Sequence, residues 1–406
     1  MSSFVLVVNT GSSSLKYSLV DGASGDSPAS GSVERIGESS GRLSHEVDGQ
    51  EHVEERAFPD HDSALRAALD AFAAYGPSLD SAGVVAVGHR VVHGGERFSA
   101  PALVDDDVIG AVEALVPLAP LHNPANLEGI AVARKLFPDL PQVAVFDTAY
   151  HHTMPPAAYT YAVPLAWRDE HAIRRYGFHG TSNAYVARSA AAALGRAPEE
   201  VDVIVLHLGN GASATAVRGG RSVDTSMGMT PLEGLVMGTR SGDVDPALHA
   251  HLHRSLGWSL DDIDTALNRS SGLKGLAGDN DFREVMRLRA AGDAGAALAF
   301  DVYSYRIRKY VGAYYAVLGT VDAVVFTAGV GEHSPEVRAA SLSGLSRLGI
   351  SVDPDRNAGP VDGPTFISPD SADVAVLVVP TDEEYEIARQ ALSLVEEGRQ
   401  ARHETP

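Results

Sequence analysis

Apolar residues along the chain gather in short valine-rich runs, and longer stretches of helical period lie between these runs. Such runs, bounded by glycine, proline or polar residues, are typical of buried strands. We predict strands at residues 4–8, 84–87, 143–146, 201–208, 321–326 and 374–379. Apolar residues at helical spacing predict helices at residues 63–74, 183–194 and 294–318. Because strands alternate with helices, the pattern indicates an α/β fold with mixed or parallel sheets.

The segment at residues 21–62 follows a different pattern. It is rich in Gly, Ser, Glu and Asp, and its apolar residues alternate with polar ones only over short pieces. Such alternation predicts exposed antiparallel hairpins. A variable loop is the alternative.

Three of the predicted strands end in glycine-rich turns, at residues 9–13, 209–213 and 327–332. The first two turns lie about half a chain apart and follow similar strands, which suggests two duplicated lobes. In α/β sheets, ligands bind at the carboxyl ends of strands. We therefore expect these turns to share one ligand.

The first turn, Asn-Thr-Gly-Ser-Ser-Ser-Leu-Lys at residues 9–16, has the chemistry of a phosphate-binding loop. Glycine lets the backbone come close to an anion. The hydroxyls of Ser12, Ser13 and Ser14 and the ammonium of Lys16 add donors and positive charge. The spacing differs from that of an ordinary P-loop. A tight hairpin with a polar tip is the alternative.

Charged residues follow several of the other strands. Arg90 lies among glycines at residues 88–95, where a guanidinium can bind a carboxylate or phosphate through two hydrogen bonds. Asp147 and Glu383 each follow a strand and are candidate Mg²⁺ ligands. The alternatives are a surface salt bridge for Arg90, a helix cap or turn for Asp147, and a solvated acidic turn for Glu383.

Two further segments carry candidate chemistry. His179 stands between glycines just before a predicted helix, where Thr181 or Ser182 could cap the helix. The histidine could donate to a transferring phosphoryl group, or it could be structural. Arg240 lies in a glycine-rich loop at residues 226–246, and such a loop is suited to closing over a ligand.

Composition restricts the class of protein. A chain of 406 residues suggests two or three domains. The 32 basic and 53 acidic residues give a formal charge of −21, so we expect no nucleic-acid partner and no membrane partner. The absence of cysteine excludes disulfides and thiolate chemistry. With no basic leader and no apolar run near 18 residues, we expect a cytoplasmic enzyme.

Taken together, the motifs at residues 9–16, 88–95, 176–182, 207–211 and 327–332 resemble those of the acetate kinase family, in the same order. The resemblance extends from residue 4 to about residue 392. It implies an α/β fold of the sugar kinase/Hsp70/actin type, with two duplicated ribonuclease H-like lobes around a nucleotide cleft. The N-terminal lobe would comprise residues 1–150 completed by a helix at 385–406, and the nucleotide-binding lobe residues 151–384.

The resemblance also implies roles for individual residues. The catalytic positions would be Arg90, His122, Asp147, His179, Asn210 and Arg240, of which His179 and Arg240 would stabilise the transition state. The metal positions would be Asn9 and Glu383. The pocket for the acetate methyl group would be formed by Val92, Leu121, Phe178 and Pro231, with Arg90 binding the carboxylate. The nucleotide-binding positions would be Ser12, Ser14, Lys16, His207, Leu208, Gly209, Asn210, Gly211, Asp281, Phe282, Arg283, Gly329, Val330, Gly331, Glu332 and His333.

One position departs from the family pattern. The family commonly has asparagine where this chain has His333, which puts one nucleotide-side hydrogen bond in question.

The implied reaction is reversible transfer of the ATP γ-phosphoryl group to acetate, with Mg²⁺ or Mn²⁺, by a homodimer. The alternatives within this class are a propionate or butyrate kinase and a pyrophosphate-linked acetate kinase. An actin- or Hsp70-like ATPase switch and a purely structural binding module are the alternatives from other classes.

Overall fold

The computed structural model describes residues 3–403, and the chain divides into two compact units. The first unit contains residues 3–150 and 382–403, and the second contains residues 151–381. Residues 382–384 therefore belong with the first unit, whereas the predicted division assigned them to the second lobe. The predicted terminal helix at 385–406 begins earlier, at Glu383, and its residues 404–406 lie outside the described part. Within residues 3–403, no helix is long and apolar enough to cross a bilayer.

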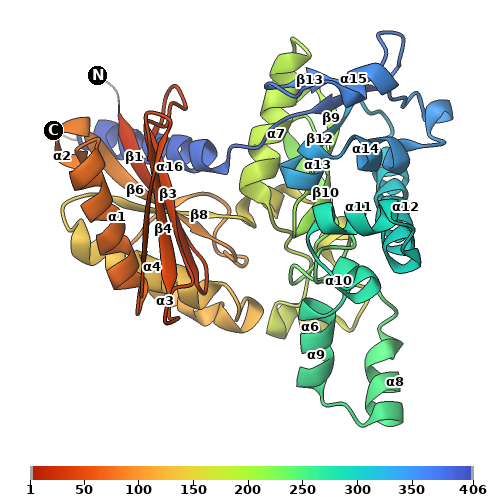
Figure 1. Cartoon of the computed structure of the whole chain (residues 1–406), viewed down its shortest axis with the longest axis horizontal. Coiled ribbons are helices and arrows are strands. Elements are labelled where there is room, and N and C mark those ends of the chain that lie inside the picture. The colour runs from red at the N-terminus through yellow and green to blue at the C-terminus, as the bar shows by residue number, and fades with distance from the viewer. Residues whose placement is uncertain (1–2, 404–406) are drawn as a thin grey trace. The chain divides into compact units, whose positions relative to one another are not determined.

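The first unit is built on an eight-stranded sheet with the spatial order β5-β4-β3-β2-β1-β6-β8-β7 (Figure 1). Its strands are β1 (Phe4–Thr10), β2 (Ser14–Asp21), β3 (Ala29–Glu34), β4 (Gly41–Val47), β5 (Gln50–Arg56), β6 (Val84–Val91), β7 (Ala102–Leu103) and β8 (Gln142–Phe146). Strands β2 to β5 form successive antiparallel pairs, which confirms the hairpins predicted for residues 21–62. Strand β1 runs parallel to β6, and β6 runs parallel to β8.

Helices cover both faces of the first sheet. They are α1 (His61–Tyr75), α2 (Leu79–Ala82), α3 (Asp106–Ala114), the 3₁₀ turn η1 (Val116–Leu118), α4 (Asn123–Leu136) and α16 (Glu383–His403). On one face, Leu6 and Val8 pack with Phe72 of α1. On the other face, Val5 packs with Ile387 of α16. Because successive strand residues point to opposite faces, the near-continuous apolar run of β1 supplies both cores.

The second unit contains a six-stranded sheet with the order β11-β10-β9-β12-β14-β13. Its strands are β9 (Asp202–Leu208), β10 (Ala212–Arg218), β11 (Arg221–Thr225), β12 (Ala323–Thr327), β13 (Thr365–Phe366) and β14 (Ala375–Val378). Helix α7 (Gly180–Ala193) packs on β9 and β12, and α12 (Ala294–Leu318) packs on β9 and β10. Figure 1 shows these two helices on either side of the sheet.

The remaining helices of the second unit are shorter. They are η2 (Ala149–Thr153), which begins at the boundary between the units, α5 (Pro156–Tyr159), α6 (Leu165–His171), η3 (Pro198–Glu200), α8 (Ala247–Leu256), α9 (Leu260–Arg269), α10 (Gly272–Ala277), α11 (Phe282–Ala290), α13 (Ala328–His333), α14 (Pro335–Leu342), η4 (Ser346–Leu348) and α15 (Pro354–Ala358).

Five strands of each sheet follow the same topology. When the five strands of each set are numbered in chain order, their spatial order is third, second, first, fourth and fifth. This gives β3-β2-β1-β6-β8 in the first sheet and β11-β10-β9-β12-β14 in the second. In both sets the first strand is antiparallel to the second and parallel to the fourth. This shared order confirms the predicted α/β fold with two duplicated lobes.

Candidate active site

In the first unit, Arg90 lies between two carboxylates. Its Nε is 3.1 Å from Asp147 Oδ1, and its Nη2 is 2.7 Å from Asp147 Oδ2. Its Nη1 lies 3.2 Å from Glu383 Oε2 at the start of α16. The side chains are 19% exposed for Arg90, 2% for Asp147 and 16% for Glu383. The guanidinium is therefore a positioned, largely buried group and not part of a surface salt bridge.

The electrostatics of this cluster favour a permanent cation between two acids. Burial alone would lower the pKa of Arg90, but Asp147 and Glu383 raise it above its ordinary value. Burial raises the pKa of Glu383, and Arg90 and Lys16 oppose that rise. Lys16 therefore lies close enough to Glu383 to interact with it through its charge.

The turn at residues 9–16 is a hairpin that joins β1 to β2. Asn9 and Lys16 are direct partners across the two strands, and the Gly11 N–H donates to the Ser14 carbonyl over 2.8 Å. Ser12 is exposed at the tip, and Ser14 begins β2. The backbone of this turn is therefore a tight hairpin with a polar tip, the alternative given above. Lys16 is exposed and can still contact an anion.

Two buried asparagines of α4 hold the segments that carry candidate residues, and our sequence analysis missed both. The Nδ2 of Asn126 donates to the Thr10 carbonyl, and its Oδ1 accepts from the Val92 N–H. Asn123 exchanges two hydrogen bonds with the backbone of His93. Asparagine is a poor residue for a helix interior, so the two asparagines, three residues apart in this segment, were the sequence signal that could have pointed to such a role.

The other candidates of the first unit lie around these segments. His122 occupies the N-cap position of α4 and is half-buried. Leu121 is 44% exposed, and Val92 is half-buried just after β6.

In the second unit, His179 has a left-handed backbone conformation, with φ 56° and ψ 25°. This conformation is rare for a residue with a side chain and is often found at functional sites. The His179 Nδ1 lies 3.0 Å from Ser213 Oγ, and its ring stacks on His207 at 4.0 Å. The Nε2 edge of His179 therefore remains the one aimed at Gly211.

The predicted cap of α7 was wrong. His179 itself occupies the N-cap position, and neither Thr181 nor Ser182 caps the helix because both lie within its first turn. The Ser182 hydroxyl instead lies 2.8 Å from His207 Nδ1 and 2.8 Å from Thr381 Oγ1. Ser182 thus orients the histidine on which His179 stacks.

Arg240 and His179 converge on the turn between β9 and β10. A methyl group placed on Gly211 would lie 3.5 Å from both Arg240 Nη1 and His179 Nε2. Arg240 Nη1 donates to the Pro231 carbonyl over 3.2 Å, and no described carboxylate forms an ion pair with it. Burial lowers the pKa of Arg240. A half-buried cation without an anionic partner among the described residues is suited to binding an anion.

The loop at residues 226–246 that carries Arg240 is fixed by its surroundings. Arg175 Nη1 lies 3.0 Å from each of three carbonyls, those of Thr225, Ser226 and Met227. The Asp243 carboxylate accepts from the Gly234 N–H and from the Tyr310 hydroxyl, each at 2.8 Å. The glycine-rich loop is therefore held in place by hydrogen bonds at several points.

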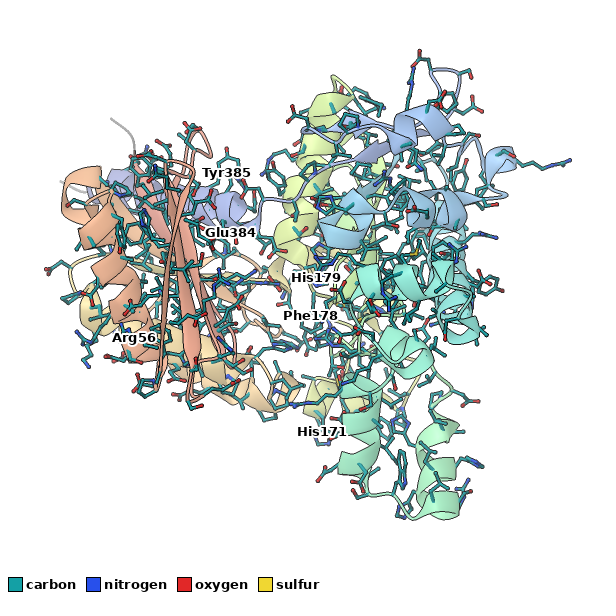
Figure 2. All side chains as sticks on the ribbon, in the orientation of Figure 1. Arg56, His171, Phe178, His179, Glu384 and Tyr385 are labelled. Carbon is teal, nitrogen blue, oxygen red and sulfur yellow. The ribbon has the colours of Figure 1, made fainter. Side chains whose placement is uncertain are left out.

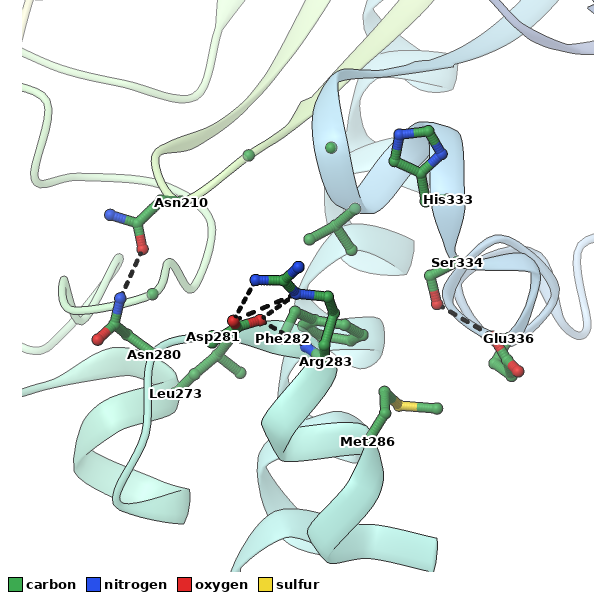
Figure 3. Close-up of a pocket in the computed structure, with 14 residues that line it drawn as sticks. Asn210, Leu273, Asn280, Asp281, Phe282, Arg283, Met286, His333, Ser334 and Glu336 are labelled. Atoms are coloured by element: carbon green, nitrogen blue, oxygen red, sulfur yellow. Dashed lines mark hydrogen bonds and ion pairs between the residues drawn. The ribbon is translucent and has the colours of Figure 1, made fainter. Parts of the chain in front are cut away.

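A cavity of about 620 Å³ lies beside this turn, between the ends of β9 and β12 (Figure 3). These strands are parallel, with Thr327 opposite His207, so two of the three predicted glycine-rich turns, those at residues 209–213 and 327–332, meet at one sheet edge. The predicted residues that line the cavity are Gly209, Asn210, Asp281, Phe282, Arg283, Gly329, Val330 and His333. The lining residues not predicted are Gly238, Leu273, Asn280, Met286, Ser334 and Glu336.

The cavity is lined by both polar and apolar side chains. Asn280 Nδ2 lies 3.4 Å from Asn210 Oδ1 near the turn, and Arg283 pairs with Asp281 at 2.6 Å (Figure 3). Leu273, Met286 and Val330 supply apolar surface. Apolar surface with a small number of polar groups is typical of pockets that bind small molecules.

Other predicted nucleotide-side residues have supporting positions. His207 and Leu208 are buried at the end of β9. Glu332 Oε1 accepts from the Thr381 N–H over 3.2 Å, and the Gly331 carbonyl accepts from Arg338. Phe178 is buried, and its carbonyl lies 2.9 Å from His151 Nε2; Figure 2 labels Phe178 and His179 where they precede α7.

The model of the acetokinase family matches residues 4–389. The chain belongs to the acetokinase family. The match spans nearly the whole region over which the motifs resemble that family.

Several members of the acetokinase family are close relatives. The chain is 61% identical over 395 residues to the acetate kinase of Streptomyces griseus subsp. griseus, with 96% of each chain covered. Its structure matches the crystal structure of Porphyromonas gingivalis acetate kinase with a TM-score of 0.92 and 44% identity, covering 97% of this chain and 100% of that one. It also matches a propionate kinase from Francisella tularensis, with a TM-score of 0.91, 41% identity and coverages of 96% and 99%.

Proposed function

We propose that the chain is an acetate kinase, which transfers the γ-phosphoryl group of ATP to acetate and forms acetyl phosphate and ADP. The observation that carries this proposal is the convergence of Arg240 and His179 on Gly211, beside the cavity at the ends of β9 and β12. We infer that this cation, which pairs with no described carboxylate, and the histidine stabilise the terminal phosphate of the nucleotide. The relatives named acetate kinase support the same activity.

The chemistry requires no general base. Acetate is ionised at neutral pH, so its oxygen can attack the γ-phosphorus directly. The enzyme has to orient two anions and stabilise charge on the transferring group. We assign this stabilisation to Arg240, His179 and Asn210, and the binding of the acetate carboxylate to Arg90. In the reverse direction, the same groups would bind acetyl phosphate and ADP.

We assign the methyl group of acetate to the apolar side chains of Val92, Leu121, Phe178 and Pro231, as the family resemblance implies. Ser12, Ser14 and Lys16 are assigned to the phosphates of the nucleotide, and His122 to the acceptor side.

The first unit has donors that suit Mg²⁺. Asp147, Glu383 and Asn9 offer hard oxygen ligands, and no group of three or more His, Asp or Glu residues among the described residues forms a complete metal site. Mg²⁺ usually keeps several waters and binds through one or two carboxylates plus substrate phosphates. When bound, the ion neutralises charge on the nucleotide phosphates. We propose that these three residues hold Mg²⁺, or Mn²⁺ in its place.

A propionate kinase is the second candidate, favoured by the likeness to the Francisella tularensis enzyme. One extra methylene changes discrimination by only about 1–3 kcal/mol. We therefore expect some propionate turnover. The homodimer and the cytoplasmic location implied by the resemblance remain part of this proposal, and light scattering after gel filtration measures the first.

The deciding assay incubates the protein with Mg-ATP, hydroxylamine and acetate, propionate or butyrate, and measures acyl hydroxamate. A parallel series replaces ATP with pyrophosphate. Hydroxamate with acetate as the best acid supports the proposal. ATP hydrolysis without hydroxamate from any acid would favour an ATPase switch instead.

Two variants test the assigned arginines. Arg90→Ala and Arg240→Ala should each lower kcat/KM by on the order of 10²–10⁴. Arg347→Ala is the matched control, since Arg347 is exposed and has no hydrogen bond or ion pair within the described residues. Normal rates in both variants would contradict the assignment.

A further inference from the structure

Arg338 of α14 is a fully buried cation, with only 2% of the residue exposed. No described carboxylate lies within ion-pair distance of it, and only the charge of Glu336 partly opposes the effect of burial on its pKa. Burying a charge without a partner is strongly unfavourable unless its hydrogen-bonding groups are satisfied. Burial lowers the pKa of Arg338, as expected for such a site. A buried arginine is therefore expected to make specific contacts that compensate for the burial of its charge.

The hydrogen bonds of Arg338 provide these contacts. Its Nη1 lies 3.0 Å from the Gly331 carbonyl and 2.8 Å from the Glu332 carbonyl. Its Nε and Nη2 lie 2.7 Å and 2.6 Å from Oδ1 and the backbone carbonyl of Asn357. The planar guanidinium thus joins α13 to α15 through four acceptors.

Helix α13 needs support from outside. It has six residues, too few for a helix that is stable by itself. It begins at Ala328, whose φ of 62° is uncommon for a residue with a side chain. Its last carbonyls have no partner within the helix, and Arg338 donates to two of them.

The other face of α13 lines the candidate nucleotide cavity. Gly329, Val330 and His333 belong to its lining, and they flank in sequence the two residues whose carbonyls accept from Arg338 (Figure 3). Asn357, the second anchor of Arg338, also donates to the Pro335 carbonyl over 2.8 Å. Ser334 and Glu336, on either side of Pro335, line the same cavity.

We propose that Arg338 is a positioning residue for nucleotide binding: it fixes α13 from behind the cavity wall and does not touch the nucleotide. This inference rests on the proposed function, since it assumes that the cavity binds ATP and ADP. The inference predicts an effect on nucleotide binding alone. Loss of Arg338 should weaken binding of the nucleotide and leave binding of acetate, assigned to Arg90 in the first unit, unchanged.

The test compares Arg338→Lys and Asn357→Ala with the natural protein. Lysine keeps the charge but cannot bind four acceptors in one plane. We expect KM for ATP and the dissociation constant for ADP, measured by calorimetry without acetate, to rise about tenfold in Arg338→Lys, with KM for acetate within about twofold. Asn357→Ala should change the same quantities in the same direction, but less. Arg347→Lys is the control for an exposed arginine and should change none of them.

Each result decides the inference. A selective loss of nucleotide affinity supports it, and unchanged nucleotide affinity or an equal rise in both KM values overturns it. Should Arg338→Lys fail to fold, Asn357→Ala makes the same distinction. Failure of the proposed function looks different, because the natural protein itself would then bind no ADP and form no hydroxamate.

Discussion

The cluster of Arg90, Asp147 and Glu383 makes a stability prediction that does not depend on catalysis. Arg90→Met keeps much of the apolar stem and removes the cation between two largely buried carboxylates. Breaking a buried ion pair by removing one partner is unfavourable by about 3–5 kcal/mol. For a unit of this size, that corresponds to a fall in Tm of roughly 10 °C.

The loss should depend on pH in a defined direction. The pKa of Glu383 is raised in the folded state by burial, and Arg90 opposes the rise. Without Arg90 the pKa of Glu383 in the folded state rises further. The protonated carboxyl then stabilises the folded protein at low pH, and this stabilisation is lost as the pH rises through that pKa. The deficit of Arg90→Met should therefore be smaller near pH 5 than near pH 8.

Thermal unfolding at pH 5 and pH 8, followed by fluorescence or calorimetry, measures both quantities. Arg134→Met is the control, because Arg134 pairs with the exposed Asp106 and should contribute about 1 kcal/mol or less. The double variant Arg90→Met/Glu383→Gln removes one of the two repelling acids and should recover part of the loss at pH 8. Equal deficits at both pH values, or no deficit at pH 8, would refute the reasoning.

Three further predictions follow from single contacts. Ser182→Ala removes the hydroxyl that lies between His207 and Thr381, and we expect kcat to fall about tenfold with little change in Tm, measured by hydroxamate formation and thermal unfolding. Gly238→Ala places a methyl group 1.9 Å from Asn210 Oδ1, so Asn210 must move and KM for ATP should rise; an unchanged KM would argue against a role for Asn210. Gly312→Ala, in the middle of α12 where a methyl group meets no atom within 4 Å, should instead stabilise the protein by about 0.5–1 kcal/mol in thermal unfolding.

Much of the fold could be predicted from the sequence because the apolar runs are long and unambiguous. The runs at residues 4–8 and 143–146 became β1 and β8, buried on both faces as their continuous valines indicate. Helix α12 has the predicted bounds, 294–318. The order of the strands could not be read from periodicity, which reports which face of a strand is buried but not its neighbours.

The candidate site was predictable where motifs lie on strand ends and unpredictable where contacts are distant in sequence. His179, Asn210 and Arg240 stand in glycine-rich turns that can be recognised locally. The pairing of Arg90 with Glu383 joins residues nearly three hundred positions apart, and no local sequence feature indicates it. The cap assigned to Thr181 or Ser182 failed because Ser182 finds a buried histidine and threonine as partners instead.

The position of α16 has a consequence for how the protein is made. This last helix covers a face of the first sheet, with Ile387, Ala388 and Ala391 packed against Val5 and neighbouring strand residues. Because α16 follows the entire second unit in the chain, the first sheet has one apolar face uncovered during synthesis until α16 has emerged from the ribosome. Until then that face is exposed to solvent and to other proteins in the cell.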